Sequence, residues 1–504
     1  MRAMILPLLA ALAAVSLHAQ QASPYIPVDD ETMPYVEHLI RAGVIADPDP
    51  LTRPLRRGDV VAALQAADTT GATAAVRATV RALLARLVPA SGSPSYRADL
   101  YLQAAAANQD RRDPLRPVGD GYVAGRGGMR LSAAFGPVAL SSHAYIDQYL
   151  QFDPDYTGNK SKNPPGRLTD AYISVQGKYG EAFLGALNRN WGPTGLDGFL
   201  TSPYAYSYDH LMLRAGTRAV RAEVLTTQLD DMTDTAGVVI HRYWASARVL
   251  MRPWKWMVAS VDNATLWYGP TRTFEPRFLN PLKLSFITVN DDNLSDSQNS
   301  LLNGSLRLAL PRGIVLQGSL LVDAISGGID AHAPDPLPTR GAIDGVADIP
   351  VAHGMAVRVW TGAVSAYAYR APSGPQNTVM LRGVGLGENF ADYWETGVTV
   401  SLVPWPFILL RPELVFLKQG EGDFRLPNPP LPVAGPVIFE GVIERTLRLG
   451  LAGEASILRR LDLDLNAGVH RIENAEHQTG VSRTRFVGRV ALTYRFGGAV
   501  RLPE

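Results

Sequence analysis

Aromatic and planar polar side chains gather in two Gly- and Pro-containing segments, residues 188–210 and 267–293. An aromatic face can pack on the CH groups of a sugar ring, while amide, carboxylate and guanidinium groups satisfy the sugar hydroxyls. Both segments therefore have the residue types of a carbohydrate-binding site. The candidate contacts to such a ligand are Arg189, Asn190, Trp191, Asp197, Tyr204, Tyr206, Trp267, Tyr268, Arg272, Arg277, Asp291, Asp292 and Asn293.

The charged residues allow two narrower hypotheses. An acidic glycan would be bound by Arg189, Arg272, Arg277 and Arg382, because guanidinium pairs with carboxylate through two hydrogen bonds. The oxygen-rich run 290–296 could instead hold Ca²⁺, but it lacks the Gly and the terminal Glu of an EF-hand loop. A solvated acidic loop is favoured, and no metal or cofactor is expected.

Catalysis has little support in the sequence. The chain has no His-Glu-x-x-His, Gly-x-Ser-x-Gly or phosphate-loop motif, and it contains no cysteine, which excludes thiol nucleophiles and disulfides. Asp462 and Asp464 form a carboxylate pair, but they alternate with apolar residues beside Arg-bearing strands, where charge pairing is a sufficient reason for them. A net charge of +1 gives no basic surface for nucleic acid. We expect a protein that is not an enzyme.

The elements that carry these residues have mainly β patterning. From about residue 97 apolar and polar residues alternate, as in RTRFVGRVALTYRF, where Phe486, Val490 and Leu492 share one face and Arg485 and Arg489 share the other. Such segments run for about ten to fifteen residues, enough for a tilted strand to cross a bilayer. A large secreted sandwich or propeller is the alternative, but its strands are usually shorter.

The connections alternate between very short and long. Outer-membrane barrels have this asymmetry, with tight periplasmic turns and long external loops. The pattern predicts an antiparallel barrel of about eighteen strands over residues 96–504, with long extracellular loops. In this setting the segment 188–210 is an external loop that folds into the barrel mouth, with Trp191 as a packing anchor. Tyr204, Tyr206 and Tyr208 share one strand face, which favours an interfacial aromatic girdle over sugar stacking.

The N-terminal part has a different character. Residues 1–19 have the Arg and the short apolar core of a secretory signal peptide. Residues 20–95 carry apolar residues at helical spacing and predict a small helical bundle, which the loop pattern places in the periplasm. Part of it, about residues 30–90, faintly resembles S-layer homology repeats, which attach to cell-wall polymers; helices that only pack on one another remain the favoured interpretation.

Several segments resemble, in order, those of the capsule-assembly Wzi family. They are LGALNRNWGPTGLDGFLTSPYAY, LWYGPTRTFEPRFLNPLKLSF with the following NDDNLSDSQNSLLNGSLRLAL, LQGSLLVDAI and LRGVGLGENFADYWETGV. The Arg-x-Trp-Gly-Pro turn at residues 189–193 is the most specific of them. The resemblance implies an eighteen-stranded outer-membrane barrel with a periplasmic helical bundle and an occluded pore, acting as a surface lectin that holds capsular polysaccharide.

Three functions stay open from the sequence. The first is an outer-membrane barrel that binds and retains surface polysaccharide, with glycan and membrane lipid as partners. The second is an outer-membrane diffusion channel. The third is a barrel that tethers the outer membrane to cell-wall polymer through residues 30–90.

Overall fold

The computed structural model describes residues 21–88, 94–234, 236–285, 297–324, 339–370, 378–426, 438–456 and 460–500. The predicted signal peptide, residues 1–19, lies outside this range. So do three predicted ligand residues, Asp291, Asp292 and Asn293.

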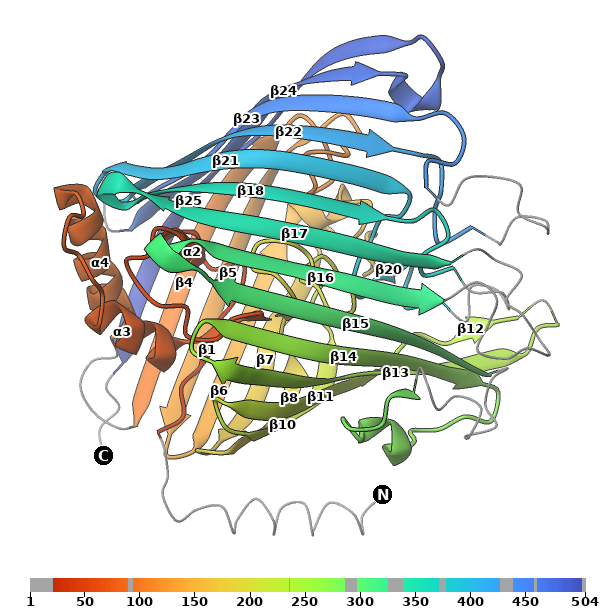
Figure 1. Cartoon of the computed structure of the whole chain (residues 1–504), viewed down its shortest axis with the longest axis horizontal. Helices are drawn as coiled ribbons and strands as arrows, with labels where there is room; N and C mark the ends of the chain where they lie inside the picture. The colour runs from red at the N-terminus through yellow and green to blue at the C-terminus, as the bar shows by residue number, and fades with distance from the viewer. Residues whose placement is uncertain are drawn as a thin grey trace.

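Eighteen antiparallel strands close into a barrel (Figure 1), which confirms the predicted fold class. Closure is made by the last strand pairing with the first, from Arg489 opposite Ala107 to Val500 opposite Tyr96. The strands are β4 (Ser95–Ala107), β5 (Tyr122–Phe135), β6 (Val138–Asp147), β7 (Gly166–Gln176), β8 (Gly180–Ala186), β10 (Asp209–Gly216), β11 (Val220–Gln228), β13 (Val239–Trp254), β14 (Met257–Gly269), β15 (Gln298–Ala309), β16 (Val315–Ala324), β17 (Arg340–Val351), β18 (Met355–Val364), β21 (Tyr393–Trp405), β22 (Ile408–Gln419), β23 (Glu444–Ser456), β24 (Leu461–Glu473) and β25 (Ser482–Val500).

Alternation along the strands separates an apolar outer face from a polar inner face. Phe486 and Val490 of β25 are exposed on the outside. On the inside, Arg489 pairs with Asp464 at 2.5 Å and Arg495 pairs with Asp462 at 2.7 Å. The sequence interpretation of this carboxylate pair as lumenal charge pairing is therefore confirmed.

An aromatic belt surrounds the end of the barrel that has the short turns. Trp254 and Trp256 stack with their ring centroids 5.3 Å apart at the turn between β13 and β14. Both are exposed, as are Trp405 and Tyr179 at other turns of the same end. Amphipathic rings of this kind mark the boundary between lipid and water on a barrel.

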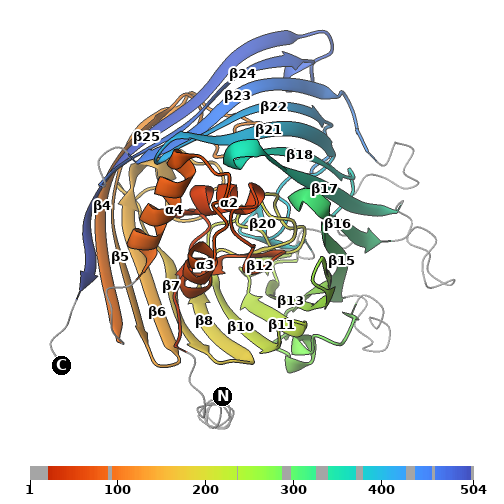
Figure 2. The same cartoon turned by 60° about the vertical axis from the view of Figure 1, so that its left-hand side comes forward.

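Three helices lie at this short-turn end: α2 (Met33–Arg41), α3 (Arg57–Gln65) and α4 (Ala74–Leu87) (Figure 2). Thr73 begins α4 by accepting a hydrogen bond from the Val76 amide at 3.2 Å. The helices share one apolar cluster with the inward-facing Val403 and Leu409 of β21 and β22. They are thus seated in the end of the barrel and not suspended below it. None of the helices in the described ranges is both long and apolar enough to cross a bilayer.

Shorter elements lie in the loops and in the lumen. They are β1 (Tyr25–Ile26), β2 (Thr52–Arg53), β3 (Leu55–Arg56), β9 (Asn190–Trp191), β12 (Met232–Thr233), β19 (Met380–Leu381), β20 (Val384–Gly385) and the 3-10 helices η2 (Gln148–Gln151), η3 (Pro276–Leu279), η5 (Pro311–Gly313), η6 (Ala352–Gly354) and η8 (Ala475–His477).

Candidate ligand-binding site

The loop between β8 and β10, residues 187–208, folds into the barrel lumen. There it meets the N-terminal segment, because β9 pairs with β2, with Trp191 opposite Thr52 and Asn190 opposite Arg53. We call residues 47–56 and 187–208 together the plug. The prediction that this loop folds into the barrel is confirmed, and its partner is a segment more than a hundred residues earlier in the chain.

Apolar side chains of the plug pack across the lumen. Trp191, Phe199 and Leu200 belong to one buried cluster with inward-facing residues of the wall, from Phe183 of β8 to Leu417 of β22. Trp191 is 2% exposed, so it is the packing anchor that the sequence predicted and its ring is not available to a sugar.

Asn190 shapes the turn of the plug. Its side-chain amide donates to the Leu196 carbonyl at 2.7 Å, and its carbonyl oxygen accepts from the Gly198 amide at 2.7 Å. A Cβ at Gly198 would lie 2.4 Å from the Trp191 carbonyl oxygen, so only glycine fits there. Asn190, predicted as a ligand contact, uses its amide to hold the loop.

Arg189 is likewise occupied inside the protein. Its Nε donates to His210 Nε2 at 2.8 Å, and its guanidinium lies 4.3 Å from the Phe183 ring centroid. The side chain is 3% exposed. Neither a neutral nor an acidic glycan reaches it in this structure.

Asp197 faces a lumenal cavity together with Asp113, Glu388 and Glu395. Burial, helped by the charges of Glu388 and Asp113, raises the pKa of the Asp197 carboxyl to about 7. The carboxyl is thus partly protonated near neutral pH. Among the predicted contacts that lie in the plug, Asp197 is the acidic residue, and it lines this cavity.

The expected girdle of tyrosines is wrong. Residues 203–208 are not a strand, since β10 begins at Asp209. Tyr208 packs against the central apolar cluster, and Tyr204 and Tyr206 turn toward lumenal carboxylates. The Tyr204 hydroxyl donates to Asp155 at 2.7 Å and the Tyr206 hydroxyl to Asp153 at 2.5 Å. Burial raises the pKa of both phenols above the usual range. The sequence pattern with a period of two predicted a strand here. The hydrogen bonds that the tyrosine hydroxyls donate to two buried carboxylates, Asp155 and Asp153, favour the observed loop instead.

Arg112, from the loop between β4 and β5, completes this arrangement. Its guanidinium lies 4.3 Å from the Tyr206 ring centroid and 5.3 Å from that of Tyr204, and it pairs with Asp153 at 3.2 Å. Three loops are therefore joined at one point near the long-loop end of the barrel. We call Arg112, Asp153, Asp155, Tyr204 and Tyr206 the loop lock.

The second predicted segment is divided between the two faces of the wall. Trp267 lies on the outer face but is fully buried, stacked on Phe278 at 4.4 Å and on Tyr243 at 5.7 Å. Its expected role as a platform in an external sugar site is wrong for this conformation, because the chain after β14 folds back over it. Tyr268 points to the opposite, lumenal side and joins the central apolar cluster.

Arg272 and Arg277 share one carboxylate on that returning segment. Glu275 forms an ion pair with Arg272 at 2.6 Å and another with Arg277 at 2.7 Å. The structure thus separates the predicted ligand residues into a group in the lumen and a group on the outer wall, and it does not bring them together.

A different cavity opens between the long loops, at the end of the barrel opposite the helices. We call it the outer basin. Its lining joins guanidinium, carboxylate, amide and aromatic groups from the loops between β4 and β7 and between β18 and β25: Arg111, Arg116, Asp155, Tyr156, Arg382, Asn389, Phe390, Gln419, Glu421, Asp423, Arg425, Glu444, Glu476, His477, Arg483 and Arg485.

Most charges in the outer basin are paired. Arg425 pairs with Asp423 at 3.0 Å and also donates to the Asn389 side-chain oxygen at 2.5 Å. Arg116 stacks on Phe390 at 4.3 Å. Arg382 is exposed, and its backbone amide donates to Asp230 at 2.7 Å. A lining of paired charges and amides offers both donors and acceptors of hydrogen bonds. It therefore suits a ligand with many hydroxyl groups better than a ligand with a high density of negative charge.

Sequence reasoning identified only Arg382 among these residues. The rest come from loops up to several hundred positions apart, and no local motif joins them. The available signal was the recurrence of Arg near the ends of strands on the loop side, such as Arg483 and Arg485 at the start of β25.

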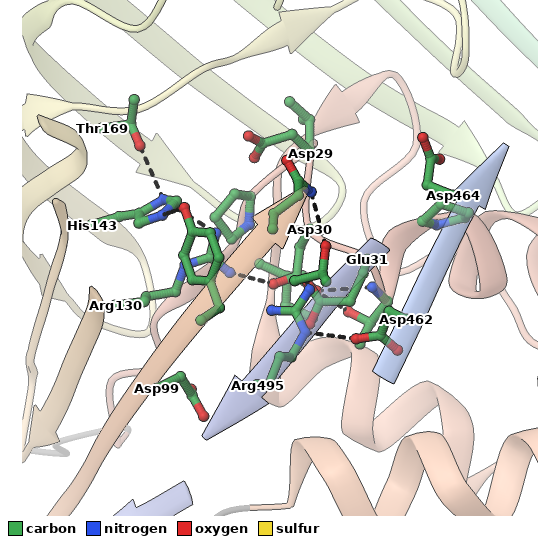
Figure 3. Close-up of a pocket in the computed structure, with 18 of the residues that line it drawn as sticks. Asp29, Asp30, Glu31, Asp99, Arg130, His143, Thr169, Asp462, Asp464 and Arg495 are labelled. Atoms are coloured by element: carbon green, nitrogen blue, oxygen red, sulfur yellow. Dashed lines mark hydrogen bonds and ion pairs between the residues drawn. The ribbon is translucent and has the colours of Figure 1, made fainter. Parts of the chain in front are cut away.

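A charged chamber lies on the other side of the plug, toward the helices (Figure 3). Asp30 pairs there with Arg130 of β5 at 2.5 Å, and Glu31 pairs with Arg495 of β25 at 2.6 Å. Although burial opposes it, the charges of Arg130 and Arg86 hold the pKa of Asp30 well below its usual range. These contacts hold the N-terminal segment against the barrel wall.

The groups of this chamber are engaged with one another. His143 lies 2.8 Å from the Tyr101 hydroxyl and 3.1 Å from the Thr169 hydroxyl. Within the described residues, no three His, Asp or Glu side chains gather in a way that could hold a metal ion.

Comparison with known proteins supports the fold. No protein-family model and no curated sequence matches the chain. Among solved structures, it is similar to Wzi, an outer-membrane protein involved in group 1 capsule assembly in Escherichia coli and described as a carbohydrate-binding β-barrel. The identity is 13%, the TM-score is 0.64, and the match covers 94% of this chain and 99% of that one. The resemblance to the Wzi family is thereby confirmed for the fold.

A more distant likeness is to Pseudomonas aeruginosa OccK3 (OpdO), at 13% identity and a TM-score of 0.46, covering 80% of this chain and 96% of that one.

Proposed function

We propose that this protein is an outer-membrane barrel that binds surface polysaccharide and retains it at the cell exterior. The long loops then face outward, the helices face the periplasm, and glycan binds in the outer basin. The observation that carries the proposal is the filled lumen beneath an open polar basin. A plugged barrel is poorly suited to transport, whereas the basin presents amides, guanidinium groups and carboxylates on the loop side.

The first experiment measures how surface polysaccharide divides between washed cells and medium, with the gene present and deleted, at matched total glycan. Release into the medium on deletion is the expected result. An unchanged division would overturn retention as the function.

A second experiment locates the site by replacing Arg382 with alanine. This side chain is exposed in the outer basin, so its removal leaves the fold intact. Arg445→Ala is the matched control, because Arg445 lies at the same end of the barrel and pairs loosely with Glu473 at 3.9 Å. If deletion releases glycan but Arg382→Ala retains it as well as Arg445→Ala does, the function stands and the basin is not the site.

The two alternative functions have less support. A diffusion channel requires an open path, and apolar contacts cross the lumen from the plug to the wall. A tether through residues 30–90 requires a free helical surface, and the helices already use apolar residues against β21 and β22. We also propose that the protein has no catalytic role, since the one carboxylate pair that the sequence suggested for catalysis, Asp462 and Asp464, forms ion pairs with Arg495 and Arg489.

A further inference from the structure

The segment after β14, residues 270–285, packs against the outside of the barrel. We call it the flap. Phe278 of η3 stacks on Trp267, and both belong to a cluster with Ala245 of β13. The Trp267 side-chain nitrogen also donates to the Thr273 carbonyl at 3.0 Å. In Figure 1 the flap is the green segment below β13.

The alternation of side chains along β14 shows that the flap covers the lipid-facing side of the barrel wall. On β14, Val258 and Leu266 point inward, where they are buried against the plug and the central cluster. Val261 and Trp267 have the opposite parity, and Val261 is 41% exposed. The flap therefore lies between the wall and whatever surrounds the barrel.

The height of the flap follows from strand geometry. Trp267 of β14 is eleven residues after Trp256, which lies in the turn before this strand and belongs to the aromatic belt at the short-turn end. A tilted strand climbs about 2.5 Å per residue along the membrane normal, so Trp267 lies about 27 Å above the belt. The apolar band of such barrels is about 25 Å tall. The flap is thus at the level of the headgroups of the opposite leaflet.

The surface that the flap turns away from the wall is apolar and basic. Leu282 is 76% exposed and Phe274 is 45% exposed, while neighbouring Phe278 is buried. Arg272, Arg277 and Lys283 outnumber the single acidic residue of the segment, Glu275. The Arg277 side chain is 45% exposed beyond its contact with Glu275. Apolar side chains beside cations fit the boundary between acyl chains and anionic headgroups.

We propose that the flap is a lipid anchor: Phe274 and Leu282 insert into the outer leaflet, and Arg277 and Lys283 bind the anionic headgroups of its lipids. The anchor is independent of polysaccharide retention. It fixes the depth at which the loop end of the barrel sits in the membrane.

The absence of cysteine from the chain makes the proposal directly testable. Leu282→Cys introduces a single thiol for a polarity-sensitive fluorophore, in the full protein reconstituted into phosphatidylglycerol vesicles. Thr479→Cys, exposed on the loop between β24 and β25, is the matched control, and Phe274→Cys is a second flap position. We expect blue-shifted emission and at least several-fold stronger quenching by bromine-labelled lipid at both flap positions than at the control. Equal quenching at flap and control positions would overturn the anchor.

The headgroup contact has its own readout. Native mass spectrometry counts phosphatidylglycerol molecules that remain bound to the wild type and to the Arg277→Gln, Lys283→Gln double variant. We expect the variant to retain fewer phosphatidylglycerol molecules and the same number of phosphatidylcholine molecules. Equal retention of phosphatidylglycerol would overturn the anionic contact. Disulfide-linked dimers of Leu282→Cys formed in vesicles would show that a second copy of the chain covers the flap, and would overturn lipid as its partner.

Discussion

The guanidinium of Arg248 lies 4.4 Å from the ring centroid of Trp191 and joins the two halves of the plug. Arg248 projects inward from β13, pairs with Glu223 at 2.5 Å, and donates to the Leu51 carbonyl at 3.0 Å and the Thr52 hydroxyl at 2.5 Å. One side chain of the wall thus contacts the N-terminal segment and the loop turn together. Both partners of the ion pair are fully buried.

Replacing Arg248 with alanine is expected to loosen the plug. Glu223 keeps Arg214 and Arg221, the Leu51 carbonyl keeps the Gly192 amide, and the Thr52 hydroxyl keeps Arg221. The loss is therefore the two hydrogen bonds from Arg248 and its contact with the Trp191 ring. A hydrogen bond from a charged donor contributes about 1.5–3 kcal/mol. The measurement is single-channel conductance in planar bilayers, where we expect frequent openings that the wild type lacks. An Arg248→Ala variant that shows no channel openings and unfolds at the same temperature as the wild type would contradict this role.

Gly198→Ala tests the turn of the plug without removing any side chain. The added methyl would meet the Trp191 and Thr201 carbonyl oxygens at 2.4 and 2.6 Å, so the turn has to move. We expect increased conductance from a barrel that still shifts in gel mobility on boiling. Gly304→Ala is the control, since a Cβ there meets nothing within 4 Å. Identical conductance of the two variants would rule out the turn as a closing element.

The loop lock predicts a separate effect at the long-loop end of the barrel. Arg112→Ala leaves Asp153, whose side chain is fully buried, without its cation. We expect the three joined loops to separate, which protease digestion of intact cells detects as new cleavage within residues 108–121 or 148–165. Cleavage equal to that of Arg445→Ala would show that the loops are held by other contacts.

Asp197 predicts a pH dependence of stability. Its pKa is raised from 3.8 to about 7, so between these values the native state holds a proton that the unfolded chain has released. The contribution of this group to stability is therefore present at low pH and is lost as the pH rises toward 7. We expect Asp197→Asn to raise the midpoint of thermal unfolding in detergent at about pH 8 and to change it little at about pH 4. A rise in the unfolding midpoint of Asp197→Asn seen only at about pH 4 would contradict the raised pKa of Asp197.

Much of the barrel was predictable because strand alternation is a local property. The parity of β24 and β25 placed Asp462, Asp464 and Arg489 in the lumen, and their ion pairs are where the pattern required them. The Trp-Gly-Pro turn at residues 191–193 likewise predicted a folded loop. These inferences need only neighbouring residues in the chain.

The site was less predictable because its determinants are not local. The sequence placed Trp267 in an external segment as a sugar contact, whereas it lies within β14 and is covered by the flap, which no local pattern indicates. Tyr204 and Tyr206 looked like strand residues until Asp155 and Asp153, some fifty positions away, supplied acceptors for their hydroxyls. The outer basin combines residues from Arg111 to Arg485, a range over which sequence order says nothing about proximity.

The pairing of β2 with β9 constrains the order in which this protein is assembled. The N-terminal segment enters the lumen from the short-turn end, while residues 187–208, which connect the paired strands β8 and β10, enter from the long-loop end. The barrel itself closes only when β25 meets β4. A plug built from two converging strands is most easily threaded while that seam is open, so biogenesis favours insertion of the N-terminal segment before the last strand docks. The seam is then the final step that traps the plug inside.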